Sequence, residues 1–266
     1  MPEFRSKPKI VAFIPARYLS TRFPGKPLAL IAGKPMVQHV YERVLAAKKI
    51  DEAYVLTDDE RVAEAVKGFG GNFLMTSSKL KSGTDRCAIG AKKINPKIVV
   101  NVQGDEPLIS PRTIDLTIAE LLGSPQDVMS TAAVPIRNES TLFSEHTVKV
   151  ALSIDKHALY FSRNVIPFLR GKKTHEYLKQ FQFLKHIGLY VYRNEFLQRF
   201  TRLKETPLEK AEKLEQLRAL ENGYRIKVAI VKEDTIPVDV PEDVFKVERY
   251  LYKKRTKSQR RSWQKL

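Results

Sequence analysis

The fold is decided by the stretch Ile10-Val-Ala-Phe-Ile14 and by the segment Pro15-Ala-Arg-Tyr-Leu-Ser-Thr-Arg-Phe-Pro-Gly-Lys-Pro27 that follows it. The first five residues are all apolar, and so short a run is typical of a buried strand in a parallel sheet. Between Arg17 and Pro27, two prolines and a glycine exclude a helix or a central strand. We therefore expect a strand that leads directly into a long loop.

Strand and helix patterns alternate outward from this stretch through the first 125 residues. The apolar runs predict strands at 10–14, 53–56, 72–75 and 97–102, and helices at 36–47, 62–69 with Thr57-Asp58 as N-cap, 84–94 and 111–122. This alternation indicates an α/β fold whose mostly parallel sheet is flanked by helices on both faces. Ligands of such sheets bind beyond the carboxyl ends of the strands, so the loops 15–27 and 103–107 are expected at one rim.

The second half of the chain is less regular. Its patterns predict strands at 128–136, 148–154, 187–192 and 225–231, helices at 207–220 and 241–252, and a mobile loop at 171–180. The helix at 207–220 would bury Leu208, Ala211, Leu214 and Leu217 on one face. We place a single domain at 1–252, a smaller second lobe within it at about 130–205, and a basic tail at 253–266.

Composition excludes several classes of protein. The chain has 266 residues, of which 42% are hydrophobic, and it contains one cysteine, Cys87. A single thiol excludes a disulfide framework and any multi-thiolate zinc or iron–sulfur site. No apolar run approaches the roughly 18–20 residues of a membrane span, and the N-terminus lacks a signal-peptide core. We therefore expect a cytoplasmic protein.

The formal net charge of +17 indicates an anionic partner, which could be nucleic acid, a membrane surface or a phosphorylated substrate. The tail at 253–266 holds seven Lys or Arg residues and no acid. A nucleic-acid-binding protein is the second class of hypothesis, but the helix-turn-helix, finger and aromatic-strand signatures are absent, so no nucleic acid is expected. With Trp263, the tail is either weakly attracted to anionic membranes or simply solvated and disordered.

Three cations, Arg17, Arg22 and Lys26, lie within ten residues of the first loop. A basic surface loop is the alternative interpretation, but the prolines and glycine would hold these cations in place. Several fixed cations suit the phosphates of a nucleoside triphosphate. The loop is neither a Walker A motif nor a Gly-x-Gly-x-x-Gly, which excludes a standard ATPase loop and a hydride-transfer site.

Two acidic positions are candidate metal ligands. Asp105 and Glu106 follow the strand that ends at Val102, and they either cap a helix or bind Mg²⁺, which prefers carboxylate oxygens. Asp239 lies between two valines at the end of a strand. Its alternative role is the N-cap of the helix that begins at Pro241.

Seven motifs in chain order resemble those of 3-deoxy-manno-octulosonate cytidylyltransferases, the CMP-Kdo synthetases. They are Ile14 to Leu28, Ser82-Gly-Thr-Asp-Arg86, Asn101-Val-Gln-Gly-Asp-Glu-Pro107, Tyr160-Phe-Ser-Arg163, Lys185-His-Ile-Gly-Leu-Tyr190, Leu214-Glu-Gln-Leu-Arg218 and Val238-Asp-Val-Pro-Glu-Asp243. The resemblance covers about residues 9–251. It implies that CTP and Kdo give CMP-Kdo and pyrophosphate, which activates Kdo for lipopolysaccharide biosynthesis. It also implies a nucleotide-diphospho-sugar transferase-like fold, a homodimer and a requirement for Mg²⁺.

The resemblance also implies roles for individual residues. Arg17, Arg22 and Lys26 would bind the triphosphate and, with Asp105, form the catalytic set, while Asp105 and Asp239 would bind the metal. Ser82, Gly83, Thr84, Arg86 and Gln103 would surround the cytidine. The sugar would be bound by Arg163, His186, Tyr190, Glu215 and Gln216, and the smaller lobe at about 130–205 would serve sugar binding and dimerisation. Arg163 or His186 would offset the charge of the sugar carboxylate. Kdo and its 8-amino relative stay open as substrates, and Asp85, Pro237 and Val240 depart from the family pattern.

Overall fold

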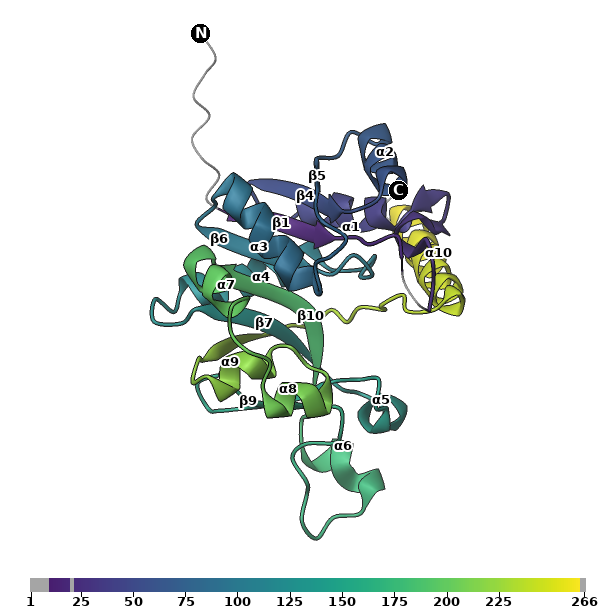
Figure 1. Cartoon of the computed structure of the whole chain (residues 1–266). Coiled ribbons are helices and arrows are strands. Elements are labelled where there is room, and N and C mark those ends of the chain that lie inside the picture. The colour runs from purple at the N-terminus through teal and green to yellow at the C-terminus, as the bar shows by residue number, and fades with distance from the viewer. Residues whose placement is uncertain (1–9, 20–21, 264–266) are drawn as a thin grey trace.

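A nine-stranded sheet forms the centre of the molecule, with the main strand order β11-β7-β10-β6-β1-β4-β5 (Figure 1). The computed structural model describes residues 10–19 and 22–263, with side chains as far as Lys254. The strands of this path are β1 (Ile10–Pro15), β4 (Glu52–Thr57), β5 (Phe73–Met75), β6 (Ile98–Val102), β7 (Met129–Pro135), β10 (Leu184–Arg193) and β11 (Ile226–Ile230). β1 pairs in parallel with β4 and β6, and β7 with β11, while β10 is antiparallel to both β6 and β7. The mostly parallel sheet is therefore as predicted.

Helices cover both faces of this sheet because its strands are apolar on both sides. In β1, Ala12 and Ile14 belong to the core on one face, and Val11 and Phe13 to the core on the other. One face carries α1 (Met36–Leu45), α2 (Glu60–Gly68) and α4 (Pro111–Leu122). The other carries α3 (Gly83–Ile94), α7 (Asn194–Phe200) and α9 (Leu217–Glu221).

Smaller elements extend from this core. β8 (Lys149–Leu152) and β9 (Ala158–Ser162) pair with each other and join the sheet through β10, while β2 (Leu30–Ile31) and β3 (Lys34–Pro35) form a separate pair. α5 (Glu139–Phe143) lies at the lower right of Figure 1, and α6 (Tyr177–Gln180) projects at the bottom. The lobe predicted at about 130–205 stays a prediction, and within that range β7 and β10 are strands of the central sheet.

Several predictions about local structure are wrong. The helix expected at 207–220 is broken into α8 (Pro207–Glu212) and α9, because Lys213 takes the left-handed conformation (φ 55°). Leu208 is consequently exposed, whereas Leu214 and Leu217 are buried. The loop expected at 171–180 contains the 3₁₀ turn Thr174–Glu176 and α6. The N-cap of α2 is Asp59, whose side chain accepts from the Arg61 N–H.

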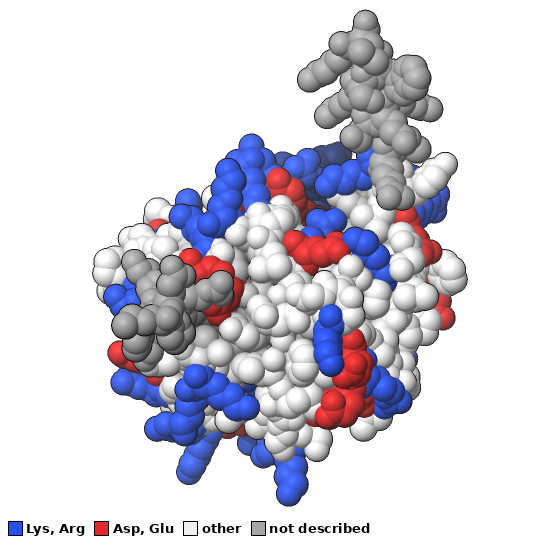
Figure 2. Space-filling view, turned by 90° about the horizontal axis from the view of Figure 1, so that it is seen from above, with Lys and Arg blue, Asp and Glu red and all other residues white. Residues whose placement is uncertain are grey.

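The last helix, α10 (Pro241–Trp263), runs beyond the predicted end at residue 252. Its first turns pack through Val244 and Val247 against Ile31 and Met36. The side chains of 255–266, most of the predicted tail, lie outside the described part of the structure. Within the part of the chain that is described, no helix combines the length and apolar character needed to cross a membrane. Figure 2 shows Lys and Arg groups mainly toward the margins of one face, with Asp and Glu among them.

Candidate active site

The loops that follow β1 and β6 meet at one rim of the sheet, as predicted. The Ala16 N–H donates to the Leu56 carbonyl at 2.9 Å, which ties the first loop to the end of β4. A Cβ added at Gly104 would lie 2.5 Å from the Pro15 carbonyl oxygen, so the two loops can approach this closely only with glycine there. Between them is a cavity of about 280 Å³. Its lining includes Arg17, Lys26, Gly83, Gln103 and Asp105.

Lys26 joins the predicted phosphate-binding loop to both predicted metal ligands. Its Nζ lies 2.7 Å from Asp105 Oδ2 and 3.8 Å from Asp239 Oδ1, and it also donates to the Val238 carbonyl at 3.0 Å. The Val238 N–H donates in turn to the Asp105 carbonyl at 2.9 Å. These bonds place the carboxylates of Asp105 and Asp239 around a single cation, although the residues are far apart in the sequence.

The other two cations of the loop have different partners. Arg22 pairs with Asp239 at 2.9 Å and its side chain is 64% exposed, while Arg17 donates to the Lys81 carbonyl at 2.5 Å. Asp239 is not the cap of α10 that was considered as its alternative role. The Asp243 carboxylate accepts from the N–H groups of residues 239 and 240 and leaves Asp239 facing the cations. Among the described residues, no three His, Cys, Asp or Glu side chains are grouped so that they could hold a metal ion.

Glu106, next to Asp105, is buried and takes no part in this cluster. Its carboxyl accepts a hydrogen bond from the Thr235 hydroxyl at 2.5 Å. Burial raises the pKa of Glu106 to about 8, and the negative charge of Asp105 adds to this effect. Of the two neighbouring acids, Asp105 is thus the one whose charge is available to a ligand.

The start of α3 brings the predicted cytidine segment to the same rim. Ser82 caps this helix in a reciprocal pair of hydrogen bonds with Asp85, each 3.1 Å long. A Cβ at Gly83 would lie 3.3 Å from the Pro15 side chain. Arg86 is placed differently from its neighbours, because its side chain is fully buried and bound to Asp58 at 2.8 Å and to the Thr76 hydroxyl. Arg86 is therefore a buried structural cation here, and its predicted contact with cytidine stays a prediction.

A chain of hydrogen bonds connects the nucleotide side of the rim to the predicted sugar side. Gln103 Nε2 donates to Asn101 Oδ1 at 3.1 Å, and Asn101 Nδ2 lies 3.5 Å from Thr84 Oγ1. The Thr84 hydroxyl donates to Glu215 Oε2 at 2.5 Å. Asn101 was not among the predicted site residues. It begins one of the seven motifs, and it is a polar amide inside a strand of valines and isoleucine, where it is completely buried.

His186 is a neutral hydrogen-bonding group. Its ring is buried against Phe161 and Tyr190, and burial lowers its pKa to about 3. The Thr131 hydroxyl gives its proton to the Leu189 carbonyl at 2.7 Å, so it accepts from His186 Nε2 at 2.9 Å. Nδ1 is then an acceptor. His186 is thus neutral in the protein alone, and the expectation that Arg163 or His186 offsets the charge of a sugar carboxylate stays a prediction.

Tyr190 and Gln216 form the next part of the predicted sugar side. The Tyr190 hydroxyl donates to Gln216 Oε1 at 3.0 Å, and burial raises its pKa above the ordinary value, so it stays protonated. Gln216 is 3% exposed, and its Nε2 has no partner among the described residues. A buried amide donor without a partner costs about 1–3 kcal/mol, which favours a ligand acceptor at this position.

Arg163 is held at the edge of this region by backbone groups. Its guanidinium donates to the carbonyls of Glu212 at 2.9 Å and Glu145 at 3.1 Å. Its own N–H donates to the Glu212 carboxylate at 2.9 Å, and its carbonyl accepts from the fully buried Lys149. These hydrogen bonds hold the Arg163 guanidinium in one position beside β9.

Comparison with known proteins identifies the family. The cytidylyltransferase family matches residues 11–228. A 3-deoxy-manno-octulosonate cytidylyltransferase of Geobacter sulfurreducens is 52% identical over 245 residues, which cover 90% of this chain and 97% of the relative. The chain belongs to the 3-deoxy-manno-octulosonate cytidylyltransferase family. A family member of Parabacteroides distasonis is 49% identical over 249 residues, covering 91% of this chain and 98% of the relative.

Solved structures agree with this assignment. A structure of CMP:2-keto-3-deoxy-manno-octonic acid synthetase complexed with CTP matches with a TM-score of 0.86 and 41% identity, covering 92% of this chain and 99% of that chain. A cytidylyltransferase of Leptospira borgpetersenii, with 17% identity and a TM-score of 0.58, shares the fold. The resemblance found in the seven sequence motifs is thus confirmed at the level of the family and of the fold.

Proposed function

We propose that this chain transfers CMP from CTP to Kdo, releasing pyrophosphate, and so supplies activated Kdo for lipopolysaccharide biosynthesis. The observation that carries the proposal is the rim cavity, which is lined by Arg17, Lys26, Gln103 and Asp105. Lys26 also pairs with Asp239. The family supports it, because the relatives are named for this reaction.

The reaction requires positioning and charge neutralisation above all. A sugar hydroxyl attacks the α-phosphorus in line, and pyrophosphate leaves. Arg17, Arg22 and Lys26 come from one loop and would bind the phosphates, offsetting the charge that moves onto the leaving group. Gln103 and the Ser82–Thr84 segment would contact the nucleoside from the neighbouring loops. Because Arg86 is buried in its pair with Asp58, we leave it out of this set.

We infer that Asp105 and Asp239 bind Mg²⁺ together with CTP. Mg²⁺ in nucleotide sites is typically held by one or two carboxylates, substrate phosphates and water, and this pair offers that donor set. Bound there, Mg²⁺ would supply positive charge to the phosphates and the reacting hydroxyl. Lys26 and Arg22, which pair with these carboxylates in the structure, would then turn their charges toward the phosphates.

The sugar would bind where β10, α3 and the turn before α9 meet. Gln216 Nε2 offers a buried donor without a partner, and Glu215 and His186 Nδ1 offer acceptors for hydroxyl groups. Arg163 would supply the positive charge for the sugar carboxylate that the neutral His186 does not provide. These roles follow the family pattern and fit the hydrogen-bonding capacity of each side chain.

Three further expectations stay proposals. A homodimer is supported by the exposed rings of Phe143, Phe168 and Phe181 around the projecting α6, and sedimentation would test it. A weak attraction of the basic tail to anionic membranes rests on its composition alone. Truncation after Tyr252 should leave turnover intact and reduce co-sedimentation with anionic vesicles. A cytoplasmic location fits an enzyme that consumes CTP.

The decisive experiment measures pyrophosphate release from CTP with purified protein and Mg²⁺. Release that depends on Kdo supports the proposal, and release without Kdo or no release at all contradicts it. Parallel reactions with 8-amino-Kdo determine which of the two sugars has the higher kcat/KM.

A further inference from the structure

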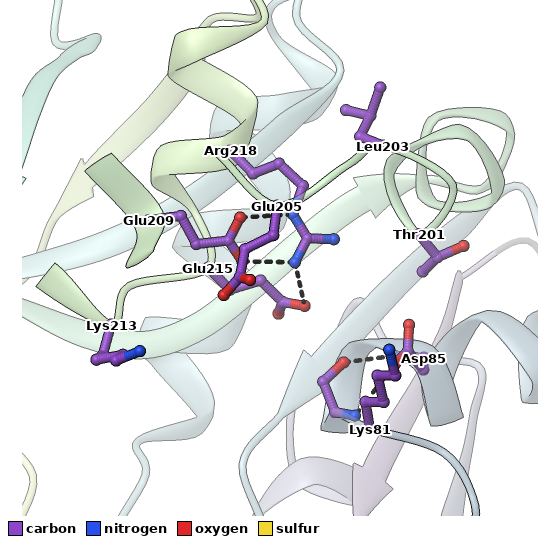
Figure 3. A pocket seen from close by; sticks show the side chains of 10 residues that line it. Lys81, Asp85, Thr201, Leu203, Glu205, Glu209, Lys213, Glu215 and Arg218 are labelled. Carbon is purple, nitrogen blue, oxygen red and sulfur yellow. Dashed lines mark hydrogen bonds and ion pairs between the residues drawn. The ribbon is translucent and has the colours of Figure 1, made fainter. Parts of the chain in front are cut away.

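The break between α8 and α9 is what brings Glu215 to the sugar side. Lys213 takes a left-handed conformation, and the chain then turns through Leu214 to Gln216 before α9 begins. In one continuous helix these side chains would follow the helix surface. Here Glu215 instead reaches across to Thr84 at the start of α3. It lines a cavity of about 490 Å³ together with Asp85, Glu209 and Arg218 (Figure 3).

Arg218 connects this turn to a buried structural acid. Its Nε and Nη2 bind the two carboxylate oxygens of Glu209 at 2.8 Å and 2.5 Å. Its Nη2 also lies 3.7 Å from Glu215 Oε1, and its guanidinium stands 5.0 Å from the ring centre of Phe200. Figure 3 shows the guanidinium between the two carboxylates, so Arg218 has one partner that is structural and one that belongs to the predicted sugar site.

The charges around Glu215 oppose one another. Burial raises the pKa of its carboxyl, and the nearby Asp85 carboxylate on α3 raises it further. The Thr84 hydroxyl and the Arg218 guanidinium both lower that pKa. The remaining ionisable groups that line the cavity are Lys81, Glu205, Glu209 and Lys213, and Tyr190 on β10 also faces Glu215. Among the residues that the structure describes, Arg218 is the cation paired with this carboxylate, at 3.7 Å.

We propose that Arg218 is a positioning residue for the sugar substrate: it holds the Glu215 carboxylate in the orientation that faces Thr84. Glu215 then presents an acceptor to a sugar hydroxyl, and Arg218 need not touch the substrate. This inference rests on the proposed function, because the sugar site is part of that proposal.

The test must separate this role from the structural pair with Glu209. Replacing Arg218 alone would leave the buried Glu209 without a partner, which can cost several kcal/mol in stability. Glu209→Gln is therefore the background, and the double variant Glu209→Gln with Arg218→Gln is compared with it. The second change then leaves no unpaired carboxylate at position 209, and Glu215 is the acid that loses its cation. Steady-state kinetics are measured separately for Kdo and CTP, with melting temperatures as a check on folding.

We expect the Arg218 change to lower kcat/KM for Kdo about tenfold or more, mainly through KM, with less than twofold effect on kcat/KM for CTP. The acid limb of the pH profile for Kdo should move to higher pH, because loss of the cation raises the pKa of Glu215. When Glu215→Gln is added to both members of the comparison, the Arg218 change should have less than twofold effect.

Arg218→Lys in the otherwise unchanged enzyme is the second test, since lysine keeps the positive charge but cannot make the bidentate contact with Glu209. It should leave the acid limb within a few tenths of a pH unit of wild type. Equal losses for CTP and Kdo, or a full Arg218 effect in the presence of Glu215→Gln, would overturn the positioning role. A wild-type enzyme that does not use Kdo would refute the proposed function and this inference with it, whereas an active wild type with an unaffected Arg218 variant refutes the inference alone.

Discussion

Replacing Lys26 with Met tests the arrangement at the centre of the candidate site. The side chain of Lys26 is 15% exposed, and its ammonium donates to Asp105 at 2.7 Å and to the Val238 carbonyl at 3.0 Å. A hydrogen bond to a charged group contributes about 1.5–3 kcal/mol, and one to a neutral carbonyl about 0.5–1.5 kcal/mol. Asp105 is 31% exposed, so water screens the pair and the lower ends of both ranges apply. The expected loss is about 2 kcal/mol.

A loss of about 2 kcal/mol corresponds to a decrease in melting temperature of roughly 4–8 °C for a chain of this length. The matched control is Lys34→Met. Lys34 pairs with Glu42 at the similar distance of 2.8 Å, but both side chains are nearly half exposed. Such a pair contributes about 0.5 kcal/mol or less, so the control should melt within about 2 °C of wild type. Scanning calorimetry on the two variants in parallel gives the comparison.

The same variant should also change metal binding. In the free enzyme the Lys26 ammonium lies between Asp105 and Asp239, so Mg²⁺ must compete with it for these carboxylates. Lys26→Met should therefore bind Mg²⁺ more tightly without CTP, by about tenfold or about 1.4 kcal/mol, when titrated by calorimetry. It should nevertheless lose activity, because a phosphate-binding cation is gone. Unchanged melting temperature together with unchanged Mg²⁺ affinity would refute the view that Lys26 bridges the two acids.

Three other perturbations separate the parts of the site. Arg22→Ala should lower kcat/KM for CTP on the order of 10²-fold, about 2.7 kcal/mol, with little change in melting temperature because the side chain is 64% exposed; unchanged CTP kinetics would remove Arg22 from the site. Asp105→Asn should lower turnover by roughly 10²–10³-fold while the protein stays folded, and EDTA should stop the wild-type enzyme until Mg²⁺ is restored; full activity in EDTA contradicts the metal proposal. His186→Asn should raise KM for Kdo and leave CTP affinity unchanged by calorimetry. The pKa of His186 is about 3 in the folded protein and below its value in the unfolded chain. The free energy of unfolding of wild type therefore decreases as the pH falls from about 6.5 toward 3. In urea titrations at pH 4, the variant should have lost roughly 3 kcal/mol less of this free energy than wild type.

The first half of the fold could be predicted because its local patterns and its packing agree. β1, β4 and β6 are short apolar runs that are buried on both faces, and the helices between them alternate with them in the expected order. The position of the first loop at the ligand-binding rim followed from the strand before it. The close approach of that loop to Gly104 agrees with the same prediction.

Local patterns failed where the conformation of one residue or a distant partner decides the structure. The apolar spacing at 207–220 is typical of one helix, yet α8 ends before Lys213. The buried ion pair between Arg218 and Glu209 joins the two sides of the resulting turn, and the spacing does not predict that pair. Arg86 lies in a motif that resembles a nucleotide-binding segment. Its guanidinium nevertheless donates a hydrogen bond to Asp58 inside the protein. Asp58 lies 28 positions earlier in the chain, and no spacing rule predicts this partner.

The sugar side of the site depends on strand direction, which the sequence patterns did not specify. β10 lies antiparallel to β6, with Leu189 opposite Val102, so the residues before Leu189 extend beyond the carboxyl end of β6. His186 therefore reaches the same rim as Asp105, although it comes from the beginning of a strand and Asp105 follows the end of one. The register of β10 with β7 shifts between Ile187 and Tyr190, and such bulges redirect side chains next to binding sites. An antiparallel strand inserted into a parallel sheet thus brings the hydrogen-bonding groups proposed for the sugar to the rim where the parallel strands place the loops proposed for the nucleotide.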